Sequence, residues 1–196
     1  MEFQERYRSG DTPWEINRAD YNLIKTVQDI PISPCRALDI GCGTGNNALW
    51  LSQQGFKSVG IDSSNLAIDR AREKARNSGA DCSFHVLDFI ENSIPDAPFD
   101  LVFDRGCFHL FRKHNSRKQF AAKVAQILNK DGHWLTLTGN VDETREGPGP
   151  PRLSALEIIS AVEPYFEILS LVANHFDSDQ EVPAKNWVCL MKKRNK

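Results

Sequence analysis

A glycine-rich turn directly after a short apolar strand is the feature that most constrains the fold of this chain. The apolar run CRALDI at residues 35–40 is followed by GCGTG at residues 41–45. Alternate glycines permit backbone conformations that other residues avoid, and they let a ligand approach the main chain. The helix-length segment that follows, 46–54, would offer free N–H groups at its start. This order predicts a strand, a ligand-binding turn and a helix.

Further strands and helices alternate along the chain. Apolar runs bounded by turn residues predict strands at 35–40, 56–62, 82–89, 99–104, 133–139, 165–176 and 186–193. The last two strands have only a polar loop between them and should pair antiparallel. The pattern predicts an α/β fold in which a doubly wound, seven-stranded, mostly parallel sheet carries helices on both faces and one antiparallel strand in a C-terminal hairpin.

Capping residues predict where three further helices begin. Ser63 and Ser64 precede a helix that runs through residue 76, and Ser116 with Gln119 has the spacing of a capping box before a helix that stops at residues 131–132. A second capping-box pattern precedes a short helix that ends near residue 164. The Gly- and Pro-rich stretch at 139–152 is too polar for a regular element, and loops of this length are often functional.

Composition excludes several classes of protein. The chain has 196 residues, enough for one domain, and its net charge of −2 lacks the basic excess typical of nucleic-acid binders. Five scattered cysteines without a CxxC pair predict a reducing, cytoplasmic setting, and no apolar stretch approaches the roughly 20 residues of a membrane span. We therefore expect no nucleic-acid partner and no membrane. We also expect no metal, because the histidines are too dispersed to form a ligand set: His85, His114, His133 and His175.

An acidic residue after the second predicted strand gives the glycine turn a partner. Asp62 would lie at the same sheet edge as the turn, where a carboxylate accepts both hydroxyls of a ribose. The dinucleotide fingerprint GxGxxG needs a third glycine where this chain has Asn46, so a nicotinamide dehydrogenase is disfavoured.

Four segments together resemble a known family. LDIGCGTGNNALWL, VGIDSS, VLDF and FDLVFD, between about residues 35 and 139, are similar to the motif series of class I S-adenosylmethionine-dependent methyltransferases. The resemblance implies a Rossmann-like methyltransferase fold with S-adenosylmethionine as cofactor. It also implies a single methyltransferase domain at 35–196, preceded by a lid segment and helix at 1–34 over the cofactor site.

The same resemblance assigns residues to parts of the cofactor. The glycine turn would pack against the methionine part, Asp39 would hold the amino group and Asp62 the ribose. Asp88 and Phe89 would meet the adenine, although a turn acid and a core phenylalanine are the structural alternatives. The complete set of cofactor residues implied is Trp14, Asp39, Gly41, Gly43, Gly45, Asp62, Ser63, Asp88, Phe89 and Asp104.

Two shorter matches lie outside this series. GDTPWE at 10–15 resembles the N-terminal segment of the thiopurine, thiol and halide methyltransferase group, and GPGPPR at 147–152 resembles the Gly-Pro loop of that group. By this resemblance Trp14 would cap the cofactor and substrate, or else simply pack. Arg152 would steer an anionic substrate, or else remain a solvated loop residue.

The segment after the fourth predicted strand is where methyl donor and acceptor should meet. Asp104 and His109 are the candidate bases, and Arg105 and His109 the candidate substrate contacts; a partly buried helix histidine is the alternative for His109. Cys107 is expected to be a packing thiol. The segment lacks the Asn/Asp-Pro-Pro-aromatic motif of enzymes that methylate bases or glutamine side chains. It also differs from the aromatic-rich sequence that the thiopurine enzymes have at this point, so their substrate is not carried over to this chain.

The small number of candidate catalytic side chains favours a soft nucleophile as the methyl acceptor. A thiol, with a pKa near 8.5, is partly ionised at neutral pH, whereas an alcohol or a protonated amine needs a base. We therefore predict methyl transfer to a small-molecule acceptor, a thiol or another soft heteroatom, by a monomer or weak homodimer. Two alternatives stay open: methylation of a small oxygen or nitrogen acceptor, and a non-catalytic accessory protein that binds S-adenosylmethionine.

Overall fold

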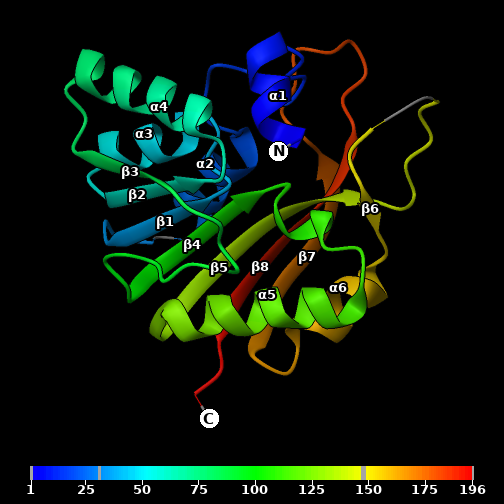
Figure 1. The fold of residues 1–196 in the computed structure, drawn as a ribbon. Coiled ribbons are helices and arrows are strands. Elements are labelled where there is room, and N and C mark those ends of the chain that lie inside the picture. The colour runs from blue at the N-terminus through cyan, green and yellow to red at the C-terminus, as the bar shows by residue number, and fades with distance from the viewer. Residues whose placement is uncertain (1, 31, 147–148, 196) are drawn as a thin grey trace. The chain divides into compact units, whose positions relative to one another are not determined.

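The computed structural model describes residues 2–30, 32–146 and 149–195. The chain divides into two compact units, Met1–Pro95 and Asp96–Lys196, and each has its own strands and helices (Figure 1). Within the described residues, no helix is long and apolar enough to cross a membrane.

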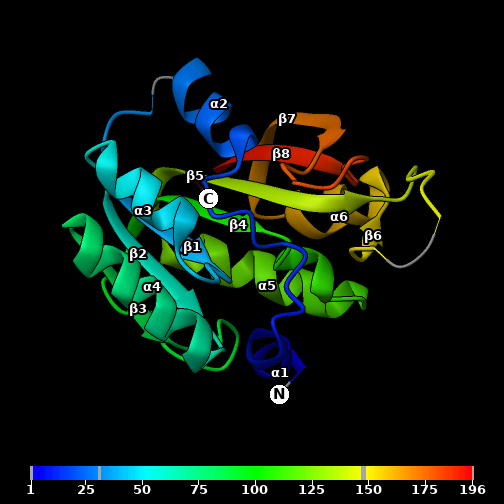
Figure 2. The same cartoon turned by 90° about the horizontal axis from the view of Figure 1, so that it is seen from above.

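The first unit is built on three parallel strands in the order β3-β2-β1. These strands are β1 (Arg36–Ile40), β2 (Lys57–Asp62) and β3 (Cys82–Val86). The helices of this unit are α1 (Glu2–Ser9), α2 (Tyr21–Asp29), α3 (Asn46–Gln53) and α4 (Asn65–Ser78). The views in Figures 1 and 2 show α3 and α4 side by side along the strands, and α1 contacts α4.

Local sequence signals explain the ends of α4. The Ser64 side chain accepts a hydrogen bond from the Ala67 N–H at 3.2 Å, and Gly79 ends the helix in the left-handed conformation. The predicted cap is therefore confirmed at Ser64. Strand β3 stops at Val86, before the predicted end at residue 89, because the chain turns at Asp88.

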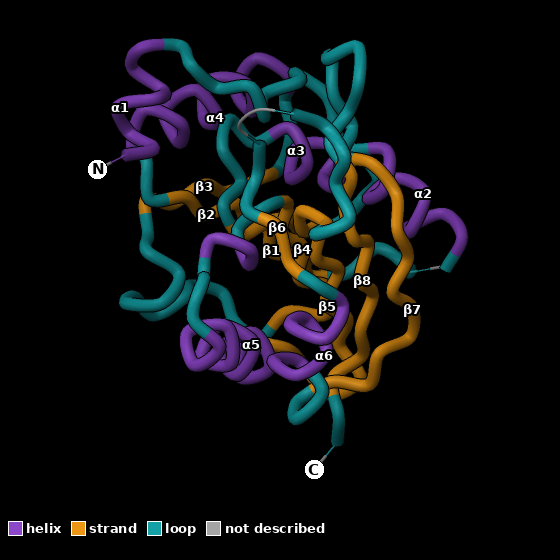
Figure 3. Tube along the Cα trace, turned by 90° about the vertical axis from the view of Figure 1, so that its right-hand side faces the viewer, coloured by secondary structure: helices purple, strands orange, loops and turns teal. Residues whose placement is uncertain are grey.

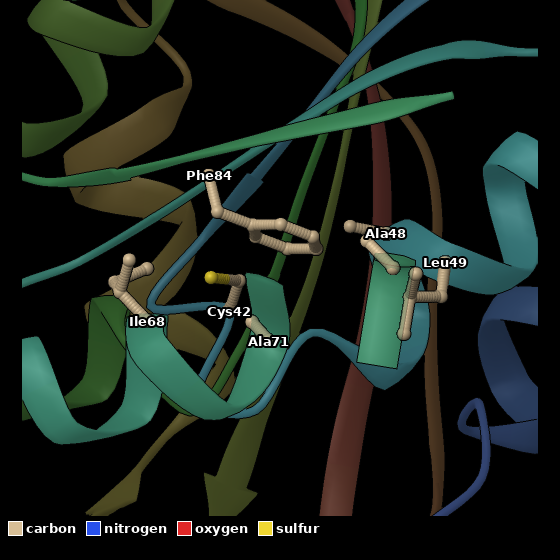
Figure 4. Packing of buried hydrophobic residues seen from close by; sticks show 7 residues of the cluster. Cys42, Ala48, Leu49, Ile68, Ala71 and Phe84 are labelled. Atoms are coloured by element: carbon tan, nitrogen blue, oxygen red, sulfur yellow. The ribbon is translucent and has the colours of Figure 1, made fainter. Parts of the chain in front are cut away.

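An aromatic ring joins helices α3 and α4 of the first unit to the strands. Phe84 on β3 packs against Ala48 and Leu49 of α3 and Ile68 and Ala71 of α4 (Figure 4). Small side chains at these helix positions let α3 and α4 approach the same ring. This cluster supports the helix that follows the glycine turn, and so fixes where the turn lies.

The second unit contains four long strands in the order β4-β5-β8-β7, with β6 beside β5. The strands are β4 (Phe99–Arg105), β5 (Leu128–Asn140), β6 (Arg152–Leu153), β7 (Phe166–His175) and β8 (Lys185–Lys193). Strand β8 runs antiparallel to both β5 and β7, which confirms the predicted reversed strand in a C-terminal hairpin. The helical segments are η1 (Phe108–Leu110), α5 (His114–Ile127) and α6 (Ala155–Val162), and α5 lies beside α6 (Figure 3).

Three local predictions for this unit need correction. Helix α5 begins at His114, upstream of the predicted Ser116 cap, and its N-cap residue Lys113 makes no side-chain capping bond. Strand β5 begins at Leu128, before the predicted start at residue 133, with a register shift between Phe99 and Leu101 of the partner strand β4. The two-residue strand β6 makes eight strands among the described residues where seven were predicted, because its Gly- and Pro-rich flanks hide it.

The capping box of α6 is confirmed. The Ser154 hydroxyl oxygen accepts from the Glu157 N–H at 3.2 Å, and the Glu157 carboxylate accepts from the Ser154 N–H at 2.9 Å.

An aromatic core surrounds the fully buried Trp134 of β5. The centroid of the Trp134 ring lies 5.3 Å from that of Phe108 and 5.3 Å from that of Phe166. Packing of this kind holds the end of β4 in place.

Candidate active site

The glycine turn of the first unit has the backbone and the space that glycine alone supplies. Gly41, Gly43 and Gly45 all have positive φ, at 68°, 53° and 84°. A side-chain carbon on Gly43 would lie 2.6 Å from the Tyr7 hydroxyl, and one on Gly45 would lie 2.7 Å from the Phe84 ring. Conformation therefore favours glycine at all three positions, and close packing also requires it at Gly43 and Gly45.

Asp62 ties the end of β2 to the glycine turn. One carboxylate oxygen accepts from the Gly43 N–H at 3.0 Å, and the other accepts from the Ser64 N–H at 2.8 Å. Burial raises the pKa of Asp62, while these N–H groups oppose the rise. Each oxygen has more than one lone-pair site, so the carboxylate can still accept ligand hydroxyls. Asp39 is buried in β1, and Ser63 is exposed beside Asp62.

Asp88 and Phe89 form the turn after β3. One Asp88 oxygen accepts from the Ile90 N–H at 2.8 Å and from the Glu91 N–H at 3.1 Å. Phe89 is buried. The Leu87 N–H donates to the Asp62 carbonyl at 2.9 Å, which holds this turn against the end of β2. The structural role foreseen as the alternative for Asp88 is thus present.

The N-terminal segment lies directly on the glycine turn. Tyr7 accepts a hydrogen bond from the Trp14 indole at 3.1 Å and donates to Glu15 at 3.3 Å. Glu15 in turn accepts from the Thr44 hydroxyl, at the start of α3. Lys74 of α4 donates to the Thr44 hydroxyl oxygen at 2.7 Å. Burial raises the pKa of Tyr7 well above its usual range, so Tyr7 keeps its proton.

Asp104, at the end of β4 in the second unit, is fully buried and well supplied with donors. One oxygen accepts from the N–H groups of Cys107 at 3.1 Å and Phe108 at 2.9 Å, and the other accepts from the Trp134 indole N–H at 2.9 Å. Burial raises the pKa of Asp104 to about 6, against the effect of those donors. The carboxylate holds the start of η1 and anchors the aromatic core.

His109 lies in η1 with its ring held by β5. Its Nδ1 accepts a hydrogen bond from the Gly139 N–H at 2.9 Å, and the residue is 5% exposed. Burial, followed by the positive charge of Arg105, lowers the pKa of His109 to about 3. The imidazole is therefore neutral at physiological pH.

Arg105 and His109 share an aromatic neighbour, Phe176. The Arg105 guanidinium carbon lies 5.2 Å from the centre of the Phe176 ring, and the His109 ring meets the same ring edge-on at 6.3 Å. Arg105 also donates to the Asp177 carbonyl at 2.6 Å. The carboxyl end of β4 thus carries a cation and a neutral imidazole around one phenyl ring.

The predicted Gly-Pro loop lies only partly within the described residues, because Gly147 and Pro148 lie outside them. Arg152 is exposed in β6 and pairs in register with Gly139. A side-chain carbon on Gly139 would lie 2.2 Å from the Pro151 carbonyl oxygen, so the end of this loop packs on bare backbone.

The predicted site residues divide between the two units. The glycine turn, Asp39, Asp62, Ser63, Asp88, Phe89 and Trp14 belong to the first, whereas Asp104, Arg105, His109 and Arg152 belong to the second. Sequence analysis missed Tyr7, Lys74 and Phe176, which have no motif; Glu15 lies in the quoted GDTPWE, and its contact with Thr44 was not foreseen. Among the described residues, no group of His, Cys, Asp and Glu could hold a metal ion.

The fold and the glycine turn define an α/β protein that binds a nucleoside-containing ligand at the carboxyl ends of its strands.

A family model described as a methyltransferase domain matches residues 37–132. The chain is 30% identical over 160 residues to 2-heptyl-1-hydroxyquinolin-4(1H)-one methyltransferase of Mycobacteroides abscessus, which covers 80% of this chain and 69% of the relative. It is 29% identical over 175 residues to probable thiol methyltransferase 2 of Arabidopsis thaliana, which covers 88% of this chain and 76% of the relative.

A solved structure agrees with these relatives. The 1,6-didemethyltoxoflavin-N1-methyltransferase of Burkholderia thailandensis, with bound 1,6-didemethyltoxoflavin and S-adenosylhomocysteine, superposes with a TM-score of 0.76 at 18% identity, over 99% of this chain and 86% of that chain. The fold is therefore the Rossmann-like methyltransferase fold. The chain belongs to the class I S-adenosylmethionine-dependent methyltransferases.

The residues of the first unit fit this cofactor. Asp62 presents a carboxylate to a diol, and the start of α3, whose N-cap Gly45 makes no side-chain capping bond, presents N–H groups. A carboxylate and backbone donors are the groups that a ribose and an amino acid moiety need.

Proposed function

We propose that the protein methylates a small-molecule thiol or another soft heteroatom acceptor. When bound, S-adenosylmethionine supplies an activated methyl group, which an in-line nucleophile takes up as the carbon–sulfur bond to the cofactor breaks. The protein then needs mainly to bind, orient and exclude water. An acceptor that is already nucleophilic suits such a site.

The hydrogen bonding of Asp104 is the observation that carries this proposal. The Asp104 carboxylate accepts three hydrogen bonds from Cys107, Phe108 and Trp134 and has no exposed surface. Those contacts assign it to holding the β4 turn, and they leave it poorly suited to removing a proton from an alcohol or amine. The name of the Arabidopsis relative, probable thiol methyltransferase 2, points to the same acceptor class.

We infer the roles of the cofactor residues from the family resemblance, and the hydrogen bonds at the end of β2 support the role of Asp62. Asp62 would accept the ribose hydroxyls with Ser63 beside it, and Asp39 would help to hold the amino group. The glycine turn would face the methionine part, Asp88 and Phe89 the adenine, and Trp14 would close over the site as part of a lid. In the second unit, Arg105, His109 and Arg152 would contact the acceptor.

A second candidate function is methylation of a small oxygen or nitrogen acceptor. It is favoured by the 30% identity to a methyltransferase named for 2-heptyl-1-hydroxyquinolin-4(1H)-one, in an alignment that covers 69% of that relative. Such an acceptor would need an acidic group, because Asp104 is already engaged.

Transfer of labelled methyl groups would test the proposal. Purified protein is incubated with labelled S-adenosylmethionine and a panel of small thiols, hydrogen sulfide, halide, phenols and amines, with Asp62→Ala as the control. Labelling of thiols by the wild type, reduced in the variant, supports the proposal. Labelling of phenols or amines alone supports the second candidate. Absence of labelling despite measured cofactor binding would favour a non-catalytic accessory role or a macromolecular acceptor.

A further inference from the structure

The tautomer of His109 is set by the backbone of β5. The Gly139 N–H can only donate, so the Nδ1 atom that accepts it at 2.9 Å carries a lone pair and no proton. In a neutral imidazole the proton is then on Nε2. His109 therefore carries an N–H group, and not a lone pair, at Nε2, the nitrogen beside Gly106.

Two glycines keep the ring in this position. Gly106 has φ +79°, and a side-chain carbon there would lie 3.1 Å from Nε2 and 3.2 Å from Cε1 of His109. Gly139 carries the donor N–H, and a side-chain carbon on it would collide with the Pro151 carbonyl oxygen. The Phe176 ring packs edge-on against the imidazole. The ring thus lies between β5, the Gly106 turn and Phe176.

Neither nitrogen of this ring is free to take a proton near neutral pH. Protonation of Nδ1 would break the bond from Gly139 and place a second cation beside Arg105, in buried surroundings. The neighbouring groups of β5 and the β7 end, Gly139 and Phe176, are uncharged; Arg105 of β4 is the charged group that acts on the ring. Nε2 already holds its proton.

We propose that His109 acts in methyl transfer as a fixed hydrogen-bond donor to an anionic acceptor atom, and not as a base. The inference rests on the proposed function and narrows it: the acceptor must ionise before it binds, since His109 supplies no proton acceptor. The positive charge of Arg105 would favour the same ionised form. Thiolates and other soft anions meet this requirement, whereas alcohols and protonated amines do not.

Nitrogen NMR tests the tautomer without any need for activity. In protein labelled with ¹⁵N-histidine, the His109 signals are assigned by their loss in His109→Gln, with His133→Gln, in β5 itself, as the control variant. We expect Nδ1 to have the shift of an unprotonated nitrogen and Nε2 that of a protonated one, unchanged between about pH 5 and pH 9. A proton on Nδ1, or a titration within this range, would overturn the proposal.

Kinetics test the role in transfer. We compare wild type, His109→Gln and His109→Phe with a low-pKa aromatic thiol, an aliphatic thiol and thiocyanate, which is ionised throughout. For wild type, kcat/KM should follow the pKa of each thiol and stay level with pH for thiocyanate. Glutamine has an N–H that can replace Nε2–H, so that variant should keep more activity than His109→Phe, for which we expect a loss of about 10- to 100-fold.

Other outcomes separate this proposal from the proposed function. One enzyme pKa common to all acceptors, or equal losses in both His109 variants, would refute the donor role while leaving methyl transfer to thiols intact. Wild-type turnover of an aliphatic alcohol would refute it as well. If the wild type bound cofactor but labelled none of the acceptors, the proposed function would fail, and with it the role of His109 in transfer. The NMR result would then still establish the tautomer.

Discussion

Replacing Trp134 with phenylalanine should destabilise the protein by an amount that depends on pH. The Trp134 indole N–H donates to Asp104 at 2.9 Å, and both residues are fully buried. A hydrogen bond to a charged group contributes about 1.5–3 kcal/mol, and the smaller ring adds about 1–2 kcal/mol of lost packing. Only the first contribution requires Asp104 to be ionised.

The sign follows from linkage. Burial raises the pKa of Asp104 to about 6 in the folded state, from 3.8 for an exposed aspartate, so the stability associated with its proton is present at low pH and is lost as pH rises through about 6. Loss of the indole donor would raise the folded pKa further, since one pH unit corresponds to about 1.4 kcal/mol. The loss of stability in the variant should therefore be largest above the raised Asp104 pKa of the variant and smallest below the wild-type Asp104 pKa of about 6.

Urea unfolding measured at about pH 5 and about pH 8.5 would show the difference. We expect a total loss of about 2.5–5 kcal/mol at the higher pH and a smaller loss at the lower one, where a protonated Asp104 accepts only a weaker, neutral hydrogen bond from the indole. Trp187→Phe is the matched control, because the Trp187 indole N–H donates at 3.0 Å to the neutral Leu153 carbonyl. Equal destabilisation by Trp134→Phe at both pH values, or the same pH dependence in the control, would refute the assignment of this bond.

Three further substitutions test other parts of the molecule. Asp62→Ala should weaken S-adenosylmethionine binding by about 1–3 kcal/mol in calorimetry, through lost charge-assisted hydrogen bonds, whereas Asp69→Ala on exposed α4 surface should not; unchanged affinity would remove Asp62 from the ribose role. Trp14→Phe keeps an aromatic ring but loses the N–H bond to Tyr7, so the cofactor should dissociate faster in stopped-flow experiments if this segment is a lid. An unaltered rate would mean that Trp14 only packs. Arg117→Met should cost about 1–3 kcal/mol in thermal or urea unfolding, because the buried guanidinium donates to the Phe111 and Arg112 carbonyls and to Glu157; near wild-type stability would show those bonds to be dispensable.

Local signals predicted most of the fold. The apolar run before the glycines, the Ser64 cap and the Ser154–Glu157 capping box each act within a few residues, so the sequence carries them directly. The predicted start of α5 was wrong, since that helix begins at His114, after an N-cap residue, Lys113, that makes no side-chain capping bond. Strand β6 was missed because it is only two residues long, lies between Gly- and Pro-rich flanks and depends on pairing with β5.

The site shows the same division. Asp62 and Asp104 could be located because each follows a buried strand. Their hydrogen-bond partners could not be predicted in the same way, since Trp134 is far from Asp104 along the chain and is brought to it by β5. The Tyr7–Glu15–Thr44 contacts likewise depend on how the N-terminal segment folds back on α3, which spacing does not encode.

The two bare glycines around His109 have a consequence for how related sequences can change. A side chain at Gly106 would press on the imidazole, and one at Gly139, whose N–H donates to that imidazole, would collide with the Pro151 carbonyl. In an alignment of relatives, sequences with histidine at the position of His109 should retain glycine at both other positions. Sequences that have lost the histidine should still favour glycine at the position of Gly106, because its φ of +79° disfavours other residues even where no ring fills the space.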